Sequence, residues 1–572
     1  MRRDLWWTVA VVLVGFPSLV TAQVTVPPAG ESGVGQKALE QSQPRFRAPA
    51  EEQPDLSVED SRKVVDPGEG PKFIVKKFVV EGNTLIDDET IAPLLDVGDG
   101  LEATLGVLHL IAQEITSLYA QEGYILSRAY LPEQEIVDGV VKIQVVEGRI
   151  GQIVVEGNDW FDREDILAWL DPLYRNPALT ESALEKTLLQ LKGILGLDVK
   201  SVLKPGEEFG TSDLLLKVEE SRPFRIAVDG DNFGSRFTGE QRYGITAEGG
   251  SLLVFGDRLT LRGVKSNGDQ EFISPSYTFP VGPYGTSVTF GYTFAEFNLG
   301  ENLVALNAGG ESNIFTGQIN LSFFRTRNSE MHLTLGGEVR NFENNQADTV
   351  TSDDKLRDAF LELGGFFRDP FRARTFYNLR LQQGFSERDT TDPFNSRFLG
   401  RGDVFIASLS LSRYQSAFLG KTYFVINGAG QVVNRRVLSP DQFAVGGFGT
   451  VRGYPLAEAA GDVGFTASIE YVVPFPFKVA LTQNSQLKRL DQILSIFGFL
   501  DHGKTFIVDK QPGERDISLS GAGAGFRLNI PNIGKYYPAV SFSLAYGFPV
   551  FKGPDPSDGS SSTLYLNGMI SF

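Results

Sequence analysis

Two short segments in the C-terminal half carry the residue types best suited to a specific ionic contact. Gly446-Gly447-Phe448-Gly449-Thr450-Val451-Arg452-Gly453-Tyr454-Pro455 places one arginine on a glycine-flanked loop, and Phe499-Leu500-Asp501-His502-Gly503 places one aspartate in a largely apolar run. An arginine on such a loop can reach far into a protein, where its planar guanidinium group suits a carboxylate. Taken alone, Arg452 is equally compatible with a solvated charge on a surface loop.

The segment Gly498–Thr505 also satisfies the nucleotide-binding pattern G-x-x-x-x-G-K-T. A phosphate loop needs a helix that begins at the lysine, because the N-terminus of that helix faces the phosphates. Here the residues from Phe506 to Gly513 have no helical period, and Asp501 would place a negative charge beside the phosphates. The sequence therefore argues against nucleotide binding.

Other chemistry-bearing residues form no recognisable site. Three histidines, His109, His332 and His502, lie far apart and lack the spacing of zinc ligands. Arg401-Gly402-Asp403 is interpreted as a three-residue coincidence. We find neither a nucleophile triad nor paired catalytic carboxylates, so we expect no enzyme, no cofactor and no metal.

Composition narrows the class of protein. The 572 residues carry a net charge of −18, which makes nucleic acid an unlikely partner because phosphate binding needs a basic face. The chain has no cysteine, which excludes disulfides and thiol chemistry. Hydrophobic residues make up 41% and aromatic residues 11%, and glycine occurs 62 times, all of which suit a barrel of alternating apolar and polar residues.

The N-terminal residues predict export and then a linker. Arg2 and Arg3 precede an apolar run, Leu5–Val14, and a cleavage-like sequence ends at Ala22, so residues 1–22 read as a signal peptide. The run is too short for a membrane anchor, since a span needs about 20 apolar residues. Residues 23–71 are rich in Pro, Gly, Gln and Glu and are expected to be linker, with a weak signal for a short helix over 35–42.

The pattern then predicts one module that occurs twice. The first copy, residues 72–148, has the order strand, helix, helix, strand, strand, expected at 73–80, 88–95, 105–121, 126–131 and 140–146. The second copy, residues 149–221, repeats Val-Val-Glu-Gly-Asn and is expected to have helices after Asp162 and at 180–195, and strands at 198–204 and 213–219. Two unrelated α+β domains are the alternative, but a shared order over a whole unit is hard to obtain by chance.

Residues 222–572 change to segments of about ten residues that alternate in polarity and are separated by turn residues, which is typical of a transmembrane barrel. Clear examples lie at 287–294, 376–382, 404–411 and 539–545. About 350 residues at roughly 22 per strand and connection predict about 16 strands. This count places a long connection, residues 435–462, between the eleventh and twelfth strands. The chain ends on an alternating strand with Phe572, whereas a large soluble sandwich is the less favoured alternative.

These features together resemble a known family. The repeated β-α-α-β-β unit resembles the polypeptide-transport-associated (POTRA) domain, which stands in the periplasm before a barrel. The Val451-Arg452-Gly453-Tyr454 tip resembles the inward-folded sixth extracellular loop of two-partner secretion transporters, of the haemolysin secretion/activation type. Phe499, Asp501 and Gly503 match that family's Phe-x-Asp-x-Gly strand motif, and Phe572 resembles the signature that barrels present to their assembly machinery. The resemblance implies that Arg452 and Asp501 meet inside the barrel.

The resemblance implies an outer-membrane transporter that exports one secreted exoprotein by two-partner, or type V, secretion. Its partners would be a client with an N-terminal secretion domain, outer-membrane lipid and the barrel assembly machinery, without nucleotide or nucleic acid. Two alternatives stay open: an assembly factor that inserts other barrels, and a passive porin with accessory domains. Depletion of many outer-membrane proteins on deletion would indicate the first, and solute uptake without a secretion defect the second.

Overall fold

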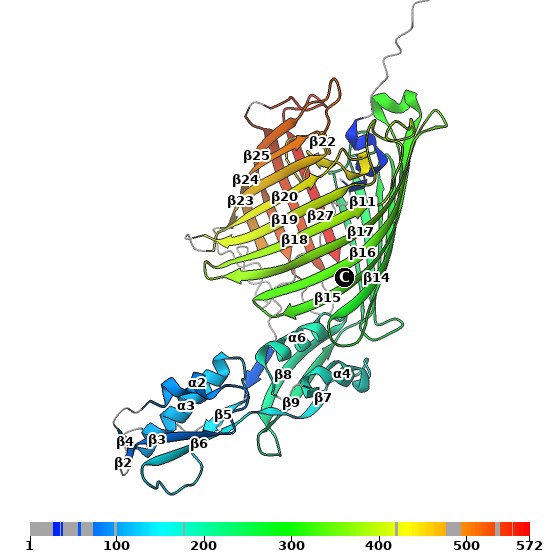
Figure 1. Ribbon diagram of the computed structural model, residues 1–572. Helices are drawn as coiled ribbons and strands as arrows, with labels where there is room; N and C mark the ends of the chain where they lie inside the picture. The colour runs from blue at the N-terminus through cyan, green and yellow to red at the C-terminus, as the bar shows by residue number, and fades with distance from the viewer. Residues whose placement is uncertain are drawn as a thin grey trace, which may run out of the picture.

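The computed structural model describes residues 27–34, 36–37, 55–58, 72–96, 100–175, 178–417, 421–475, 493–531, 538–551 and 553–572. The predicted signal peptide lies outside these residues. Two small α+β modules stand one after the other below a barrel, the first module lying farther from the barrel than the second (Figure 1). This arrangement confirms the predicted fold class.

The first module follows the predicted order with two differences. Its elements are β2 (Lys72–Val75), β3 (Lys77–Glu81), α2 (Asp88–Ile91), η2 (Ala92–Leu94), β4 (Leu101–Thr104), α3 (Leu105–Gln121), β5 (Arg128–Tyr130) and β6 (Val140–Val146). The single strand expected at 73–80 is two strands, because the N–H groups of Lys76 and Lys77 both donate to Gly139 O and break the ladder there. β2 therefore pairs with β4, which the sequence did not suggest, while β3 pairs in parallel with β6.

The second module contains β7 (Arg149–Glu156), α4 (Arg163–Trp169), α5 (Asp171–Arg175), α6 (Glu181–Lys192), β8 (Leu197–Pro205) and β9 (Thr211–Glu220). Its sheet has the order β1-β8-β9-β7. The strand β1 (Asp55–Val58) comes from the segment expected to be linker and pairs in parallel with β8. The module therefore has one sheet edge covered by a distant part of the same chain.

The same turn closes β3 and β7 in the two modules. Gly82 and Gly157 have φ of +86° and +89°, a conformation that favours glycine. In each turn an asparagine amide donates to a carbonyl three residues later: Asn83 Nδ2 to Ile86 O at 3.2 Å, and Asn158 Nδ2 to Phe161 O at 3.1 Å. Matching contacts at matching positions support duplication of one unit.

The membrane half is a closed antiparallel barrel. Among the described residues it has 16 strands, of which the first, β10, pairs with the last, β27. The strands are β10 (Phe224–Asp231), β11 (Arg242–Gly250), β12 (Arg258–Ser266), β13 (Asp269–Pro280), β14 (Thr286–Asn298), β15 (Ala308–Arg325), β16 (Ser329–Gln346), β17 (Thr349–Asp369), β18 (Ala373–Gly384), β19 (Phe405–Ser416), β20 (Tyr423–Val433), β23 (Val463–Pro474), β24 (Leu494–Phe506), β25 (Ile517–Ile530), β26 (Ala539–Pro549) and β27 (Thr563–Ser571). Closure leaves no strand edge unpaired, which is what a sheet in lipid requires.

Side chains alternate across the barrel wall as predicted. On the last strand Leu564, Leu566 and Ile570 are exposed on the outer face, whereas Tyr565 is buried inside. Inward positions carry paired charges, for example Arg242 Nε with Asp231 Oδ1 at 2.8 Å. No helix among the described residues is long and apolar enough to cross a membrane.

The second module is fixed against one end of the barrel. Lys186 Nζ of α6 donates to Ser322 O of β15 at 3.0 Å, and Arg258 Nη2 of β12 donates to Gly193 O at 2.8 Å. Phe255, in the turn between β11 and β12, packs edge-on against Trp169, with ring centroids 5.7 Å apart. This end is called the module end below, and the opposite end is called the far end.

The duplicated turn gives a test of its geometry. A Cβ added at Gly157 would lie 2.5 Å from Val218 O, whereas one added at Gly123, where φ is +90°, would meet nothing within 4 Å. Gly123→Ala should lower the free energy of unfolding by about 1 kcal/mol through backbone strain alone. Gly157→Ala should lower the free energy of unfolding by more than about 2 kcal/mol, because the collision of its Cβ adds to the backbone strain. Urea denaturation of a 72–221 fragment measures both, and equal losses would contradict the role of close approach.

Candidate functional site

The connection between β20 and β23, the eleventh and twelfth barrel strands, folds back into the lumen. It contains η4 (Ser439–Asp441) and a small hairpin of β21 (Phe443–Val445) and β22 (Ala459–Gly461). Gly446 and Gly447 follow β21 with φ of +112° and +94°, which turns the chain toward the tip. The tip is as buried as a protein core, since Val451 and Tyr454 are at most 1% exposed.

Arg452 at this tip contacts Asp501 of β24 through three nitrogen atoms. Its Nε lies 2.7 Å from Asp501 Oδ2, its Nη2 lies 2.7 Å from Oδ1, and its backbone N–H donates to Oδ2 at 3.1 Å. The two residues are 4% and 1% exposed, so the pair is removed from bulk water. This two-pronged geometry is the one that a guanidinium group offers and an ammonium group does not.

A second carboxylate completes the charge balance at the tip. Glu470 of β23 accepts from Arg452 Nη1 at 2.5 Å and from Arg527 Nη2 of β25 at 2.6 Å. Two guanidinium groups therefore face two carboxylates in a cluster whose members other than Arg527 are buried, and which we call the tip cluster: Arg452, Glu470, Asp501 and Arg527. Such compensation is what makes buried charge tolerable. Glu470 and Arg527 carry no motif, so sequence reasoning missed them.

The motif residues around Asp501 make space for the tip. The Arg452 guanidinium carbon lies 3.6 Å from the Phe499 ring centroid, a cation–π stack. A Cβ added at Gly503 would lie 2.9 Å from Val451 Cγ2. On the neighbouring strand, Gly521 pairs with Asp501, and a Cβ there would collide with Arg452 O. The glycines let the loop backbone lie directly against the barrel wall.

The remaining motif residues have separate places. Gly453 has φ of +97°, and its N–H donates to Tyr565 Oη at 2.9 Å. Tyr454 O accepts from the same hydroxyl at 3.2 Å. Phe572 lies away from the tip, at the closing seam of the barrel, where its N–H donates to Ile226 O at 2.8 Å and its side chain is exposed.

The segment that matched the nucleotide-binding pattern is part of the barrel wall. All of Gly498–Thr505 lies within strand β24, with a ladder to β23 on one side and β25 on the other. It therefore has neither the loop nor the helix of a phosphate-binding site.

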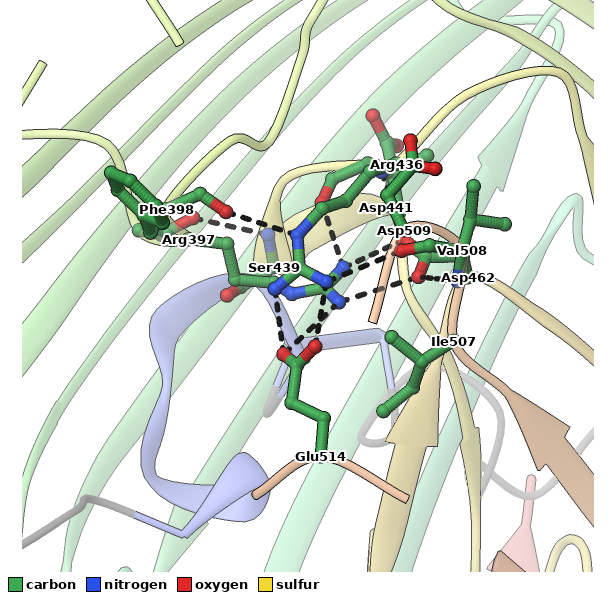
Figure 2. Close-up of polar contacts among 12 residues, drawn as sticks. Arg397, Phe398, Arg436, Ser439, Asp441, Asp462, Ile507, Val508, Asp509 and Glu514 are labelled. Atoms are coloured by element: carbon green, nitrogen blue, oxygen red, sulfur yellow. Dashed lines mark hydrogen bonds and ion pairs between the residues drawn. The ribbon is translucent and has the colours of Figure 1, made fainter. Parts of the chain in front are cut away.

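The two ends of the long loop are held by a second ionic cluster, shown in Figure 2. Arg436 pairs with Glu514 through both ends of its guanidinium group, at 2.8 and 2.6 Å. Arg397 Nη1 lies 2.7 Å from Asp462 Oδ1, and Asp462 also accepts from the Val437 N–H. Arg436 and Asp462 belong to the loop, whereas Arg397 and Glu514 come from the connections before β19 and before β25. This root cluster joins three far-end connections.

Electrostatics keep the root cluster charged over a wide pH range. The hydrogen bonds from Arg436 lower the pKa of Glu514 to about 2. The carboxylate is therefore ionised well below its ordinary pKa of 4.5, and the contribution of this pair to stability is complete above about pH 4.5 and is lost progressively as the pH falls from there to about 2.

The middle of the loop is tied to the opposite wall. Asp441 Oδ1 of η4 accepts from Arg340 Nη1 of β16 at 2.9 Å, and Arg340 Nε also contacts Asp358 Oδ2 of β17 at 2.7 Å. The Asp441 carbonyl accepts from Gln431 Nε2 at 2.7 Å. The loop is thus held at its root, its middle and its tip by charges from different parts of the barrel.

Residues from the expected linker lie beside this loop at the far end (Figure 1). η1 (Pro28–Gly30) is followed by helical residues at 32–34 and 36–37. The Ser32 N–H donates to Asn344 Oδ1 at 2.9 Å, and Lys37 Nζ donates to Gln442 O at 3.3 Å. Of the helix expected over 35–42, only residues 36 and 37 are among the described ones.

Comparison with known proteins identifies the family. Residues 210–528 match the model described as haemolysin secretion/activation protein ShlB/FhaC/HecB, and residues 73–148 match the POTRA domain, ShlB-type. The first match covers more than half of the chain. The chain belongs to this family.

Individual relatives agree with the family. The chain is 24% identical over 468 residues to the heme/hemopexin transporter protein HuxB of Haemophilus influenzae (strain 86-028NP). This match covers 81% of this chain and 80% of HuxB. It is 28% identical over 316 residues to the outer membrane transporter CdiB of Escherichia coli O6:K15:H31 (strain 536 / UPEC). This match covers 53% of this chain and 52% of that CdiB chain. The solved structure of CdiB from Escherichia coli has the same fold, with a TM-score of 0.71 and 21% identity. The match covers 95% of this chain and 96% of the CdiB chain.

This member of the haemolysin secretion/activation family is therefore a two-partner secretion transporter of the outer membrane. Its POTRA modules lie in the periplasm, so the module end of the barrel is periplasmic and the far end extracellular. The tip cluster lies within the lumen, and the root cluster lies at the extracellular end.

The close approach at Gly503 predicts how the transporter's loop responds to a small change. Gly503→Ala should push the tip away from the wall, because its Cβ meets Val451. Gly498→Ala on the same strand is the matched control, since its nearest neighbour would be 3.9 Å away.

The stacked rings of Phe233 and Phe448, with centroids 3.9 Å apart, report the tip position. The chain has no cysteine, so Phe233→Cys with Phe448→Cys gives a clean cross-linking pair. Cross-linking should fall several-fold with Gly503→Ala and stay unchanged with Gly498→Ala. Equal yields in both backgrounds would rule out a steric role for Gly503.

Proposed function

We propose that this transporter exports one large exoprotein, which it recognises through an N-terminal secretion domain, and that the Arg452–Asp501 pair holds the long loop in its transport-competent position. The buried two-pronged contact supports this role. It ties a loop that lies in the lumen to the wall of the barrel, and the wall itself is held by its own closed ladder. The pair can therefore control the loop without being needed for the fold.

We assign residues 72–148 and 149–221 to the two POTRA modules and residues 222–572 to the barrel, which are the bounds predicted from the sequence. The modules bind unfolded client by adding a client strand to a sheet edge, where main-chain hydrogen bonds supply affinity with little demand on sequence. In the first module β3 and β5 are the outer strands of their sheet. In the second, β1 pairs with the edge of β8, so a client strand must displace β1 to bind there.

In this proposal no nucleotide drives transport. Folding of the client outside the cell would therefore drive its export. We expect no enzymatic activity and no binding of nucleic acid. Outer-membrane lipid faces the apolar outer positions of the strands. The barrel assembly machinery recognises the last strand together with Phe572, the residue that follows it.

The central experiment removes either partner of the tip pair. Arg452→Ala or Asp501→Ala leaves an uncompensated buried charge, which typically costs about 3–5 kcal/mol. Both variants should give a heat-modifiable barrel in the membrane with little or no secretion. Arg452→Lys should also be impaired, because an ammonium group cannot make the two-pronged contact.

Secreted client and membrane-inserted transporter are measured side by side. The exchange Arg452→Asp with Asp501→Arg should restore part of the activity. Normal secretion by both alanine variants at normal membrane levels would remove any mechanistic role for the pair.

We further propose that residues 27–34 and 36–37 close the resting pore. The sequence predicted only a weak signal for a short helix in this segment, over 35–42. The support for closure is tertiary: Ala29 and Val34 pack with Ala444 and Ala457 of the loop. One oxygen of Glu31 is buried and has no hydrogen-bond partner among the described residues.

Burial raises the pKa of Glu31 to about 7. The docked segment therefore holds a proton that the released segment loses above its ordinary pKa of 4.5, so docking weakens as the pH rises from 4.5 to about 7 and then levels off. Planar-bilayer conductance should rise over this interval. Glu31→Gln should remove the pH dependence, whereas Lys37→Gln should keep it. If the conductance of the natural protein and that of the Glu31→Gln variant change with pH by the same amount, the proposal is wrong.

A further inference from the structure

The periplasmic connection between β11 and β12, residues 251–257, presents apolar side chains to its surroundings, and we call it the β11–β12 turn. Leu252, Leu253 and Val254 follow one another at its apex, and all three are exposed. Leu253 is 81% exposed. A turn that faces water is normally polar, and a run of exposed apolar residues marks a contact with a partner.

The backbone at this apex is satisfied from within the protein. One carboxylate, that of Asp257, accepts the N–H groups of Leu252 and Leu253, both at 2.7 Å, and that of Val254 at 2.9 Å. Asp257 is buried and also accepts from Tyr277 Oη at 2.6 Å. Lipid offers no hydrogen bonds, so a turn can enter the edge of a bilayer only where its N–H groups have partners in the protein. The apex of the β11–β12 turn meets this condition.

The apolar side chains of the turn continue the lipid-facing surface of the barrel. Gly249 lies four residues after the exposed Ile245 on β11, so both positions are on the outer face. A Cβ added at Gly249 would lie 3.3 Å from Leu252 Cδ1. The ladder partner of Gly249 on β10 is Phe224, whose side chain is also exposed. Leu252 therefore lies over the outer face of β11, beside a strand that the barrel already presents to lipid.

The height of the apolar band places the turn at the periplasmic boundary of the membrane. The extracellular boundary is marked on the outer face by Lys265 of β12, which pairs with Tyr243 of β11 and whose Nζ lies 2.6 Å from Glu271 Oε1. The apolar band of such a barrel is about 25 Å tall, and a tilted strand rises about 2.5 Å per residue along the membrane normal, so the band takes about ten residues. Counted from Tyr243 and from Lys265, it ends near residues 253 and 255, within the turn.

The next residues of the turn are packed into the second POTRA module. The Phe255 ring lies edge-on to those of Phe161 and Trp169, with centroids 5.6 and 5.7 Å apart. A Cβ added at Gly256 would lie 2.9 Å from Trp169 Cζ2. One short segment thus has exposed apolar side chains at its apex and an aromatic contact with the module directly after them. Whatever holds the apex therefore also fixes the distance between the module and the membrane.

We propose that Leu252, Leu253 and Val254 insert into the phospholipid leaflet on the periplasmic side of the outer membrane, and that Phe255 transmits this anchorage to the second POTRA module. The partner is lipid rather than a protein, because the patch is continuous with the outer face of the barrel and lies where the apolar band ends. The anchor goes beyond the proposed export, since it depends on the position of the barrel in the membrane and not on the client.

The test labels single cysteines with an environment-sensitive fluorophore in the full-length chain, which has no cysteine of its own. The protein is reconstituted in vesicles of phosphatidylethanolamine and phosphatidylglycerol. Leu253→Cys is the test position. Phe209→Cys is the matched control, because Phe209 is 79% exposed in the same module but lies beside Tyr130 of the first module, with ring centroids 6.2 Å apart. Leu261→Cys, on the outer face of β12 near the middle of the band, is the reference for deep burial in lipid.

Lipids that carry a nitroxide close to the headgroup should quench the Leu253 label several-fold more than the Phe209 label. Lipids with the nitroxide near the end of the acyl chain should quench the Leu261 label most. Iodide in the aqueous phase should quench the Phe209 label several-fold more than the Leu253 label. Equal quenching of the Leu253 and Phe209 labels, by the nitroxide lipids or by iodide, would overturn the inference and leave the proposed export intact.

Discussion

A buried arginine in the lumen of the barrel is the constraint from which the rest of this structure follows. Arg452 is 4% exposed, and a charge so removed from water is tolerated only where carboxylates and hydrogen bonds replace its hydration. Asp501 and Glu470 supply that replacement from adjacent strands. For the arginine to arrive there, the loop must be long, its turns must be glycine-rich, and the wall opposite must lack side chains. Gly503 and Gly521 meet the last requirement.

Closure of the barrel separates the stability of the wall from the position of the loop. Every strand has two neighbours, so the wall is satisfied without the lumen contents. The loop, by contrast, is held largely by side-chain contacts at its tip, its middle and its root, and its root also has backbone hydrogen bonds, such as that from Arg401 N–H to Arg436 O. The middle contact, Arg340 with Asp441, joins the loop to β16, on the opposite side from β24. The loop therefore has a defined place in the lumen, and its release breaks ionic contacts without opening the sheet.

Much of this architecture could be predicted from local patterns in the sequence, whereas the remainder depends on strand register and on contacts between distant parts of the chain. Alternation and turn residues were sufficient for the barrel, and shared order was sufficient for the two modules. Glu470 could not be predicted because it is one acidic residue in an alternating strand, and only the pairing of Glu470 with Phe499 brings it beside Arg452. The break at Lys76 depends on Gly139, 63 residues later, which no local window contains. The pairing of β1 with β8 likewise joins parts of the chain that composition alone assigns to linker and module.

The N-terminal segment and the long loop differ in what holds them, and under the proposed closure this difference sets an order for opening the pore. The N-terminal segment is held by single hydrogen bonds, such as Ser32 to Asn344, and by a small cluster of alanine and valine side chains. Neutral hydrogen bonds contribute about 1 kcal/mol each. Removing Arg452 from its partners instead exposes uncompensated carboxylates in a confined site, at about 3–5 kcal/mol. The segment also packs on the loop through Ala444 and Ala457, so it covers part of the loop's own surface. Under the proposed closure, the more weakly held segment is therefore displaced first, and the loop second, when a client enters from the periplasm.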